Sequence, residues 1–225
     1  MQEHHKEAFK AVVNARRSVR AFTDQPVPRA IQEEIFTLAS TAPSNCNTQP
    51  WQVYVASGEA CTGLRQKLYD AMMAGQFSMD FPYEGKYQGA YKERQYDAAN
   101  QLYTAMGIQR EEKDKRNAAF MRNFEFFGAP HVAFIFLPES FGIREAADSG
   151  MFAQNLMLAL SAYGLASCPQ TALSFHADTV REALGVDASN KLLFGISFGY
   201  EDTSNSANDC RVARAPLGET IHFCD

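Results

Sequence analysis

Several features that mark special classes of protein are missing from this chain of 225 residues. Its five cysteines are an odd number and show no Cys-X-X-Cys spacing, which argues against a disulfide framework and favours reduced thiols. No apolar run approaches the roughly 18 residues that a membrane helix needs. The first ten residues are polar and do not resemble a secretory signal. We therefore expect a cytoplasmic protein that contacts no membrane.

Positive charge is also scarce. The chain has 21 Lys and Arg against 26 Asp and Glu, a formal net charge of -5. Nucleic-acid binding needs a broad basic surface, so we expect no nucleic-acid partner. Any anion site must instead be a local cluster of arginines. The hydrophobic share of 46% is typical of globular proteins, and the length suits one domain over residues 1–225.

The usual signatures of side-chain catalysis are missing as well. His131, His176 and His222 are scattered along the chain, and no cluster of metal ligands accompanies them. Neither a Ser-His-Asp elbow nor a Walker-type phosphate loop is present. We therefore predict no metal site and name no catalytic side chain.

Hydrophobic periodicity predicts seven helices and three strands. The expected strands cover residues 51–56, 130–137 and 191–200, and the expected helices cover residues 3–15, 28–41, 59–74, 95–106, 111–127, 146–163 and 177–184. The helix over 146–163 is apolar on nearly all sides, which favours a central position. Residues 76–89 are expected to form a mobile loop. This order of elements predicts an α+β fold with helices packed on a small sheet.

A compact basic run follows the first helix, where Arg16, Arg17, Ser18 and Arg20 fall within five residues. Like charges this close repel one another unless an anion lies among them, and guanidinium groups suit phosphate oxygens. A solvated charge run after a helix explains the spacing equally well. The tail offers a second, weaker cationic element with Arg211 and Arg214, and the two elements together could enclose one phosphate.

Ordered motifs along most of the chain resemble the FMN-dependent nitroreductase family. The first is Arg-Arg-Ser-Val-Arg-Ala-Phe at 16–22, and the arrangement is most similar to the nitrobenzoate-reductase-like branch of bacteria. The further matching segments are 26–28, 42–51, 127–130, 150–156, 164–170 and 214–217.

The resemblance implies a nitroreductase-like fold, with helices packed around a small central mixed sheet, and an intertwined homodimer with FMN at the interface. It assigns the flavin phosphate and nearby atoms to Arg16, Arg17, Ser18 and Arg20, completed by the tail residue Arg214. It assigns contacts from the other subunit to Pro43, Ser44, Asn45, Asn47 and Gln49. The turn after the central helix, with Pro169, Gln170 and Thr171, is expected to lie along the flavin ring.

Two positions depart from the family pattern. Many relatives have a basic residue two positions before the tail arginine, where this chain has Val212, and Arg211 is a candidate to compensate. Relatives of this branch often have Gly after Pro-Gln, where this chain has Thr171.

The resemblance implies NAD(P)H-dependent reduction of a small aromatic acceptor, a nitroaromatic or a quinone, with the chemistry carried by flavin N5. The sequence does not choose between NADH and NADPH. Two alternatives stay open: reductive dehalogenation, as in deiodinase-like relatives, and non-catalytic FMN binding. Five aromatic residues in or near the expected mobile loop either cover the flavin or serve ordinary packing: Phe77, Phe81, Tyr83, Tyr87 and Tyr91.

Overall fold

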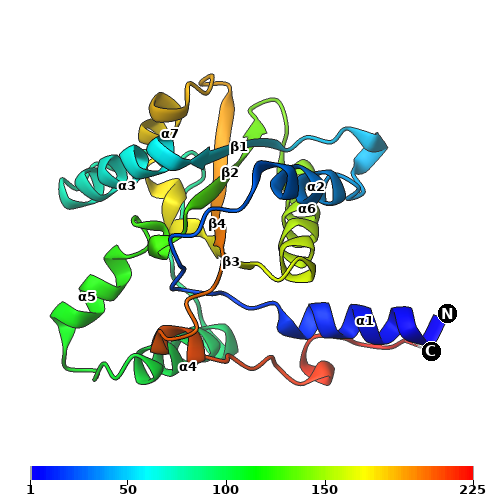
Figure 1. The fold of residues 1–225 in the computed structure, drawn as a ribbon. Helices are drawn as coiled ribbons and strands as arrows, with labels where there is room; N and C mark the ends of the chain where they lie inside the picture. The colour runs from blue at the N-terminus through cyan, green and yellow to red at the C-terminus, as the bar shows by residue number, and fades with distance from the viewer. Residues whose placement is uncertain (1, 225) are drawn as a thin grey trace.

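A four-stranded sheet lies at the centre of the computed structural model, which describes residues 2–224 (Figure 1). Its strands lie in the order β1-β2-β4-β3 and span Gln52–Ser57 (β1), His131–Pro138 (β2), Ala166–Gln170 (β3) and Asn190–Gly199 (β4). The helices are α1 (Gln2–Ala15), α2 (Arg29–Ala39), α3 (Gly58–Met73), α4 (Gly89–Ala105), α5 (Lys113–Met121), α6 (Ile143–Ala162) and α7 (Ala177–Leu184). The α+β prediction is therefore confirmed. Met1 and Asp225, the ends of the expected single domain, lie outside the described residues.

The sheet is entirely antiparallel, whereas a mixed sheet was expected. β2 pairs antiparallel with both β1 and β4, and β3 pairs antiparallel with β4. Within residues 2–224, parallel pairing is confined to isolated bridges such as Ser18 with Ser167. The expectation of a mixed sheet came from the family resemblance alone, because periodicity does not reveal the direction in which strands pair.

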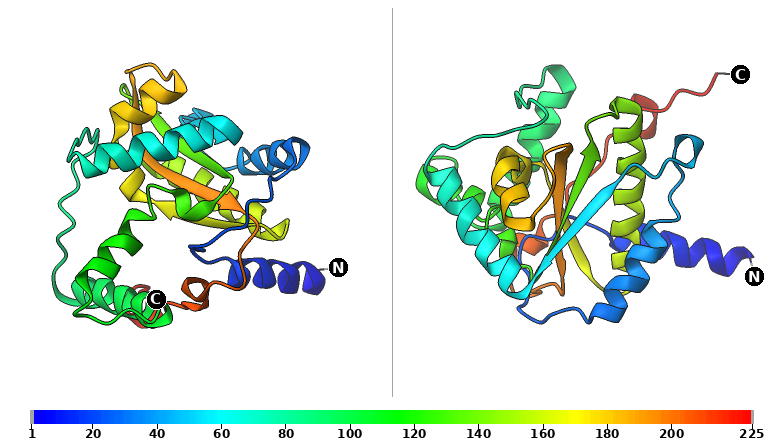
Figure 2. Two further views of the ribbon diagram at one scale, coloured as in Figure 1. Left: turned by 60° about the vertical axis from the view of Figure 1, so that its left-hand side comes forward. Right: turned by 90° about the horizontal axis from the view of Figure 1, so that it is seen from above.

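Helices cover both faces of the sheet, as the view from above shows (Figure 2). Their buried side chains form two apolar cores with the strands. On one face α3 and α7 pack against the strands through Leu64, Leu68 and Val180. On the other face α2 and α6 contribute Ile35 and Leu156. β2 lies between the cores and is buried on both sides from His131 to Leu137, as its continuous apolar sequence predicts.

Two glycines let other segments approach β4 closely. A Cβ on Gly195 would lie 2.5 Å from the Leu173 side chain, and one on Gly199 would lie 2.7 Å from Pro130. Both distances are shorter than a real carbon contact, so the packing of Leu173 and Pro130 depends on the missing side chain.

The sequence reading missed β3. Pro169 argues against a strand because proline has no N–H for the sheet. β3 is an edge strand whose strand neighbour in the sheet is β4, and on its outer side the basic run adds an isolated bridge through Ser18 and Ser167. The missing donor of Pro169 therefore breaks no hydrogen bond with another strand. Of the expected turn with Pro169, Gln170 and Thr171, the first two residues therefore end β3, and Thr171 begins the 3₁₀ turn Thr171–Phe175.

The two helices after the 76–88 segment also differ from expectation. α4 begins at Gly89, six residues earlier than predicted, and α5 ends at Met121 instead of Phe127. Phe126, Phe127 and Gly128 all have left-handed backbones, with φ of 55°, 53° and 84°, which no α-helix can continue. The Arg122 Nη2 donates to the Phe127 carbonyl at 3.3 Å, which helps to hold this conformation.

Residues 76–88 form no helix or named strand, but the first part of this segment is anchored and is not the loose loop expected. The Ser78 N–H donates to the Phe175 carbonyl at 2.9 Å. The His176 Nδ1 lies 2.5 Å from the Gln76 carbonyl oxygen. Asp80 forms an ion pair with Arg181 at 2.5 Å.

Over residues 2–224, none of the helices combines the length and the apolar character needed to cross a lipid bilayer.

Candidate functional site

The basic run and the tail meet in one pocket of about 810 Å³. Its lining comprises the end of α1, the run, one residue of α6 and the tail: Val13, Asn14, Ala15, Arg16, Arg17, Ser18, Arg20, Gln154, Cys210, Arg211, Val212, Ala213 and Arg214. We call this the arginine pocket, because five of these residues are arginines. The structure brings together the two cationic elements that could enclose one phosphate, and Arg211 lines the pocket beside Arg214.

Backbone hydrogen bonds fix the basic run between two strands. The Val19 N–H donates to the Ser167 carbonyl of β3 at 3.0 Å. Beyond β4, the Thr23 N–H donates to Tyr200 at 2.9 Å. Val19 and Ala21 are buried, and in an extended chain successive side chains alternate, so Ser18 and Arg20 face the side opposite to Val19 and Ala21. The pattern therefore turns Ser18 and Arg20 toward the arginine pocket.

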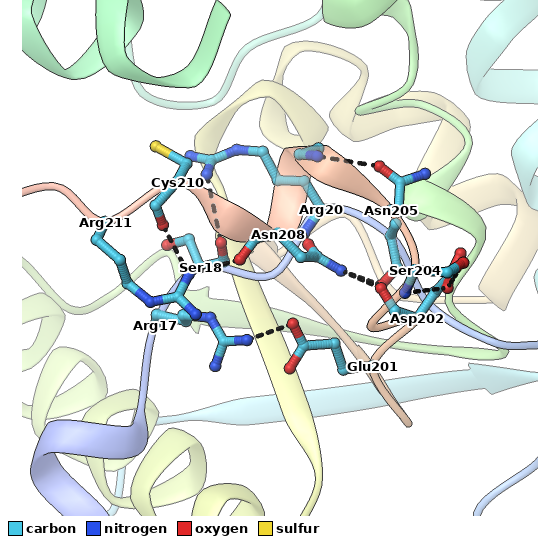
Figure 3. Close-up of polar contacts among 12 residues, drawn as sticks. Arg17, Ser18, Arg20, Glu201, Asp202, Ser204, Asn205, Asn208, Cys210 and Arg211 are labelled. Atoms are coloured by element: carbon cyan, nitrogen blue, oxygen red, sulfur yellow. Dashed lines mark hydrogen bonds and ion pairs between the residues drawn. The ribbon is translucent and has the colours of Figure 1, made fainter. Parts of the chain in front are cut away.

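Asn208 connects the tail to the basic run, a role that was not predicted from the sequence. Its Oδ1 accepts from the Arg20 N–H at 2.7 Å, and its Nδ2 donates to the carbonyls of Ala21 and Asp202, each at 2.9 Å (Figure 3). The side chain is buried and uses its acceptor and both donors. Its only signal in the sequence is a polar turn before Arg211, which predicts a loop but no partner.

One arginine of the pocket is neutralised by a carboxylate. Arg17 forms an ion pair with Glu201 through Nη2, and its Nε is buried without a hydrogen-bond partner in the described part of the chain (Figure 3). Across residues 2–224, no carboxylate lies within ion-pair distance of the remaining four, Arg16, Arg20, Arg211 and Arg214. The pocket therefore presents uncompensated positive charge, which suits a phosphate.

The end of β3 lies beside the basic run, but the Gln170 side chain is not available to a ligand. Its Nε2 donates to the Asn123 carbonyl at 2.9 Å, and its Oε1 accepts from the Ser197 hydroxyl. Only the backbone of Gln170 and its exposed neighbours Pro169 and Thr171 can face outward.

Cys168 is buried in the same strand. Burial raises the pKa of its thiol to about 11, against the opposing effect of the nearby Arg20. The thiol is therefore protonated at neutral pH, and Cys168 serves as a small buried residue of the core.

The loop that contains Pro43, Ser44, Asn45, Asn47 and Gln49 does not reach the arginine pocket of its own chain. It is exposed but ordered. The Asn45 N–H donates to Asp148 Oδ2 of α6 at 3.0 Å, and Ser44 Oγ accepts from the Gln49 N–H at 2.9 Å. Asn47 and Gln49 adopt left-handed backbones with φ of 56° and 45°. These restraints hold the loop in one shape at the surface.

The aromatic residues of 76–91 do not line the arginine pocket of the same chain either. Tyr83 stacks on Phe175 with ring centroids 5.9 Å apart, and Phe77 stacks on His176 at 5.6 Å. These two side chains thus serve packing at least in part. All five aromatic side chains, including Phe77 and Tyr83, are nevertheless exposed.

Comparison with known proteins identifies what the chain resembles. A sequence model of the nitroreductase family matches residues 13–200. Nitroreductase NfnB of Mycolicibacterium smegmatis is 47% identical over 218 residues, which cover 96% of this chain and 93% of that protein. The 4-nitrobenzoate reductase of Pseudomonas putida is 34% identical over 96% of this chain and 95% of its own. The crystal structure of FMN-dependent NfnB from Mycobacterium smegmatis in complex with NADPH superposes with a TM-score of 0.94 at 46% identity, covering 98% of this chain and 99% of that chain.

Proposed function

Because the chain belongs to the nitroreductase family, we propose that it is an FMN-dependent oxidoreductase that uses NAD(P)H to reduce nitroaromatic or quinone-like acceptors. The observation that carries the proposal is the arginine pocket, where two cationic segments almost 200 residues apart in sequence meet. Relatives that match 96% of the chain are named nitroreductase and 4-nitrobenzoate reductase, which supports the same reaction.

The residues of the pocket fit the phosphate end of FMN. Arg16, Arg20 and Arg214 supply charged donors without competing carboxylates, and Ser18 adds a hydroxyl. Arg17 and Arg211 complete the wall. The end of β3, with Pro169, the Gln170 backbone and Thr171, offers the surface along which the ring would lie. Bound FMN supplies the hydride and electron transfer between NAD(P)H and the acceptor.

The protein's own contribution is to bind and orient. A buried Asn208 fixes the backbone of the basic run, and four uncompensated arginines attract anions into the pocket. No side chain is required as a general acid or base. The single FMN-binding domain over 1–225 and a cytoplasmic location belong to the same proposal.

We further propose a homodimer in which Pro43, Ser44, Asn45, Asn47 and Gln49 of one subunit contact the FMN of the other. Two observations support it. The loop is held in one shape yet lies away from its own pocket. Large apolar side chains are exposed on α1, which projects from the body (Figure 2), and on the tail: Phe9, Val13, Leu217, Ile221 and Phe223. Exposed apolar surface of this extent is typical of a contact between chains.

The proposal is tested on the purified protein after loading with FMN. We expect flavin absorbance to remain with the protein on gel filtration at the mass of a dimer, and we expect NADH or NADPH oxidation when 4-nitrobenzoate is added. A protein that retains FMN but does not turn over nitroaromatics or quinones would contradict the enzyme assignment and favour simple FMN binding. Turnover confined to a halotyrosine would favour the dehalogenase alternative. A protein that retains no FMN would refute the whole assignment.

A further inference from the structure

We infer that Glu201 is a positioning residue that cancels the charge of Arg17, so that the phosphate of FMN is held by the charges of the other four arginines of the pocket. The inference rests on the proposed function, because it divides the roles within the same site. It also assigns to Glu201 a part in cofactor binding that the basic run alone does not reveal.

The backbone around Glu201 is fixed beside the basic run. Glu201 forms an antiparallel bridge with Phe22 directly after β4. On either side of it, Tyr200 accepts from the Thr23 N–H at 2.9 Å and the Asp202 N–H donates to Ala21 at 3.0 Å. Two chain segments are thus held in register, and this register places the carboxylate of Glu201 against the guanidinium of Arg17 (Figure 3).

Both members of the pair are mostly withdrawn from water. The side chains are 28% exposed for Arg17 and 18% for Glu201. Together they line a second cavity of about 170 Å³ next to the arginine pocket, and Arg17 lines both. Solvent screens charges in such a position less than charges at the surface. Removing one partner of the pair therefore has a large effect on a bound anion.

The other arginines differ from Arg17 in what they contact. Each of three other arginines donates through Nη1 to a backbone carbonyl. Arg20 donates to Ser18 at 3.3 Å, Arg211 to Asn208 at 2.5 Å, and Arg214 to Val212 at 2.9 Å. A carbonyl orients a guanidinium but does not neutralise it. The positive charge of these side chains is therefore not balanced by a carboxylate, and Arg16 likewise forms no ion pair within residues 2–224.

A phosphate in the arginine pocket would meet Arg17 and Glu201 as a nearly neutral unit. Removal of Arg17 alone would leave a poorly solvated carboxylate facing the phosphate, which repels it. Removal of Glu201 alone would release one more positive charge. Removal of both would leave the net charge of the site unchanged. The effects of the two changes on FMN affinity must therefore be strongly non-additive.

The test measures dissociation constants of FMN and of riboflavin, which lacks the phosphate, for the apo forms of four proteins. These are the wild type, Arg17→Gln, Glu201→Gln and the double variant. For FMN we expect Arg17→Gln to weaken binding at least about tenfold, Glu201→Gln to strengthen it about threefold, and the double variant to stay within about threefold of the wild type. For riboflavin we expect changes below about twofold, because the effect acts on the phosphate.

A matched control uses the exposed ion pair of Lys6 and Glu3 on α1, in which Nζ lies 3.1 Å from Oε1. Lys6→Gln, Glu3→Gln and their combination should leave FMN affinity unchanged. Melting temperatures of the apo proteins report folding separately from binding. If Arg17→Gln does not fold, Glu201→Gln still decides the matter through salt: its FMN dissociation constant should rise more steeply with ionic strength than that of the wild type.

The inference fails if the double variant binds FMN as weakly as Arg17→Gln, if Glu201→Gln weakens binding, or if riboflavin shows the same changes as FMN. The last result would mean that the pair acts only as a structural brace. A wild-type protein that binds neither ligand would instead refute the proposed function, so the two failures can be told apart.

Discussion

Two arginine–carboxylate ion pairs in this molecule differ in their burial and in how many of their polar atoms have hydrogen-bond partners. Arg181 and Asp80 are 10% and 8% exposed, and they join α7 to the segment before α4. Asp80 Oδ2 also accepts from the Leu192 N–H at 2.7 Å, and Arg181 also donates to Asp178 at 2.6 Å. Arg17 meets Glu201 alone and leaves its Nε without a partner in residues 2–224.

The difference separates a structural pair from a pair at a binding site. A buried charge is tolerated when its hydrogen-bonding capacity is satisfied, as it is for Arg181. The hydrogen bond with Asp80 raises the pKa of Arg181, which shows that the pair stabilises the charged form. Arg17 has one buried donor without a partner and lines two cavities, so its pair with Glu201 lies where its charge balance acts on a bound ligand.

The largest effect is expected at the structural pair. Asp80→Ala leaves the buried guanidinium of Arg181 without its main partner and frees the segment 76–80 from β4. We expect a loss of about 3–5 kcal/mol in the free energy of unfolding, measured by urea denaturation. Asp178→Ala is the control, because its exposed carboxylate bonds the same arginine and should matter far less. Equal losses in the free energy of unfolding for Asp80→Ala and Asp178→Ala would contradict the structural role given to the Arg181–Asp80 pair.

Next in size is a change at the pocket that spares folding. Arg20→Ala removes a charged donor but not the backbone bond to Asn208, so we expect FMN affinity to fall by about 1.5–3 kcal/mol while stability changes little. Lys6→Ala, on the exposed face of α1, is the control. Titration of the apo proteins with FMN measures both. An unchanged dissociation constant for Arg20→Ala would contradict the proposal that Arg20 contacts the cofactor.

Acidification should lower the stability of the protein through His176, which lies in the same region as the Arg181–Asp80 pair. Burial lowers the pKa of His176, and the hydrogen bond to Gln76 only partly offsets this. Since that carbonyl accepts, Nδ1 carries the hydrogen, and an added proton must reach Nε2, which is buried among Phe77 and Phe124. The unfolded chain takes up the proton first, so this stability is complete above about pH 6.5 and is lost as pH falls toward the folded pKa.

The measurement is urea denaturation of wild type and His176→Asn between pH 7.5 and 5. Asn can retain a donor toward Gln76 but does not titrate. We expect the variant to lose less stability than the wild type over this range. Parallel pH profiles would show that His176 does not link this region to pH.

The smallest effect is expected for a pair at the surface. Arg29 and Glu33 lie 2.9 Å apart on α2, and both side chains are largely exposed. Glu33→Ala should change the free energy of unfolding by no more than about 0.3–0.5 kcal/mol, because solvent screens the pair. Differential scanning calorimetry with and without 0.5 M NaCl provides the check. A loss as large as that for Asp80→Ala would mean that burial does not rank these pairs.

The predicted elements depended on periodicity, and periodicity worked where one face is buried. The helices at 3–15 and 177–184 and the strand at 130–137 were found within about two residues. It failed at β3, where Pro169 is tolerated only because the strand lies at an edge, and at α5, where a left-handed segment ends the helix. Both exceptions depend on neighbours distant in sequence, which a local pattern does not contain.

The candidate site shows the same division. The arginines at 16–20 stand out because the basic run contains no acidic residue, and Arg214 stands out because it lies in a motif that resembles the family. Asn208 and Glu201 do not stand out, because their roles come from the register between the basic run and the residues after β4. Gln170 was recognised from its motif, but its inward orientation depends on Asn123 and Ser197, which no spacing rule connects to it.

Gly195 and Gly199 set a limit on how this sequence can diverge. In a library of all single substitutions, most positions on the exposed helices should accept several residue types. At Gly195 and Gly199 even alanine would collide with Leu173 or Pro130 at 2.5 and 2.7 Å. A functional variant at either position should therefore arise together with a smaller residue at its neighbour, so the pairs 195–173 and 199–130 are expected to change jointly over evolutionary time.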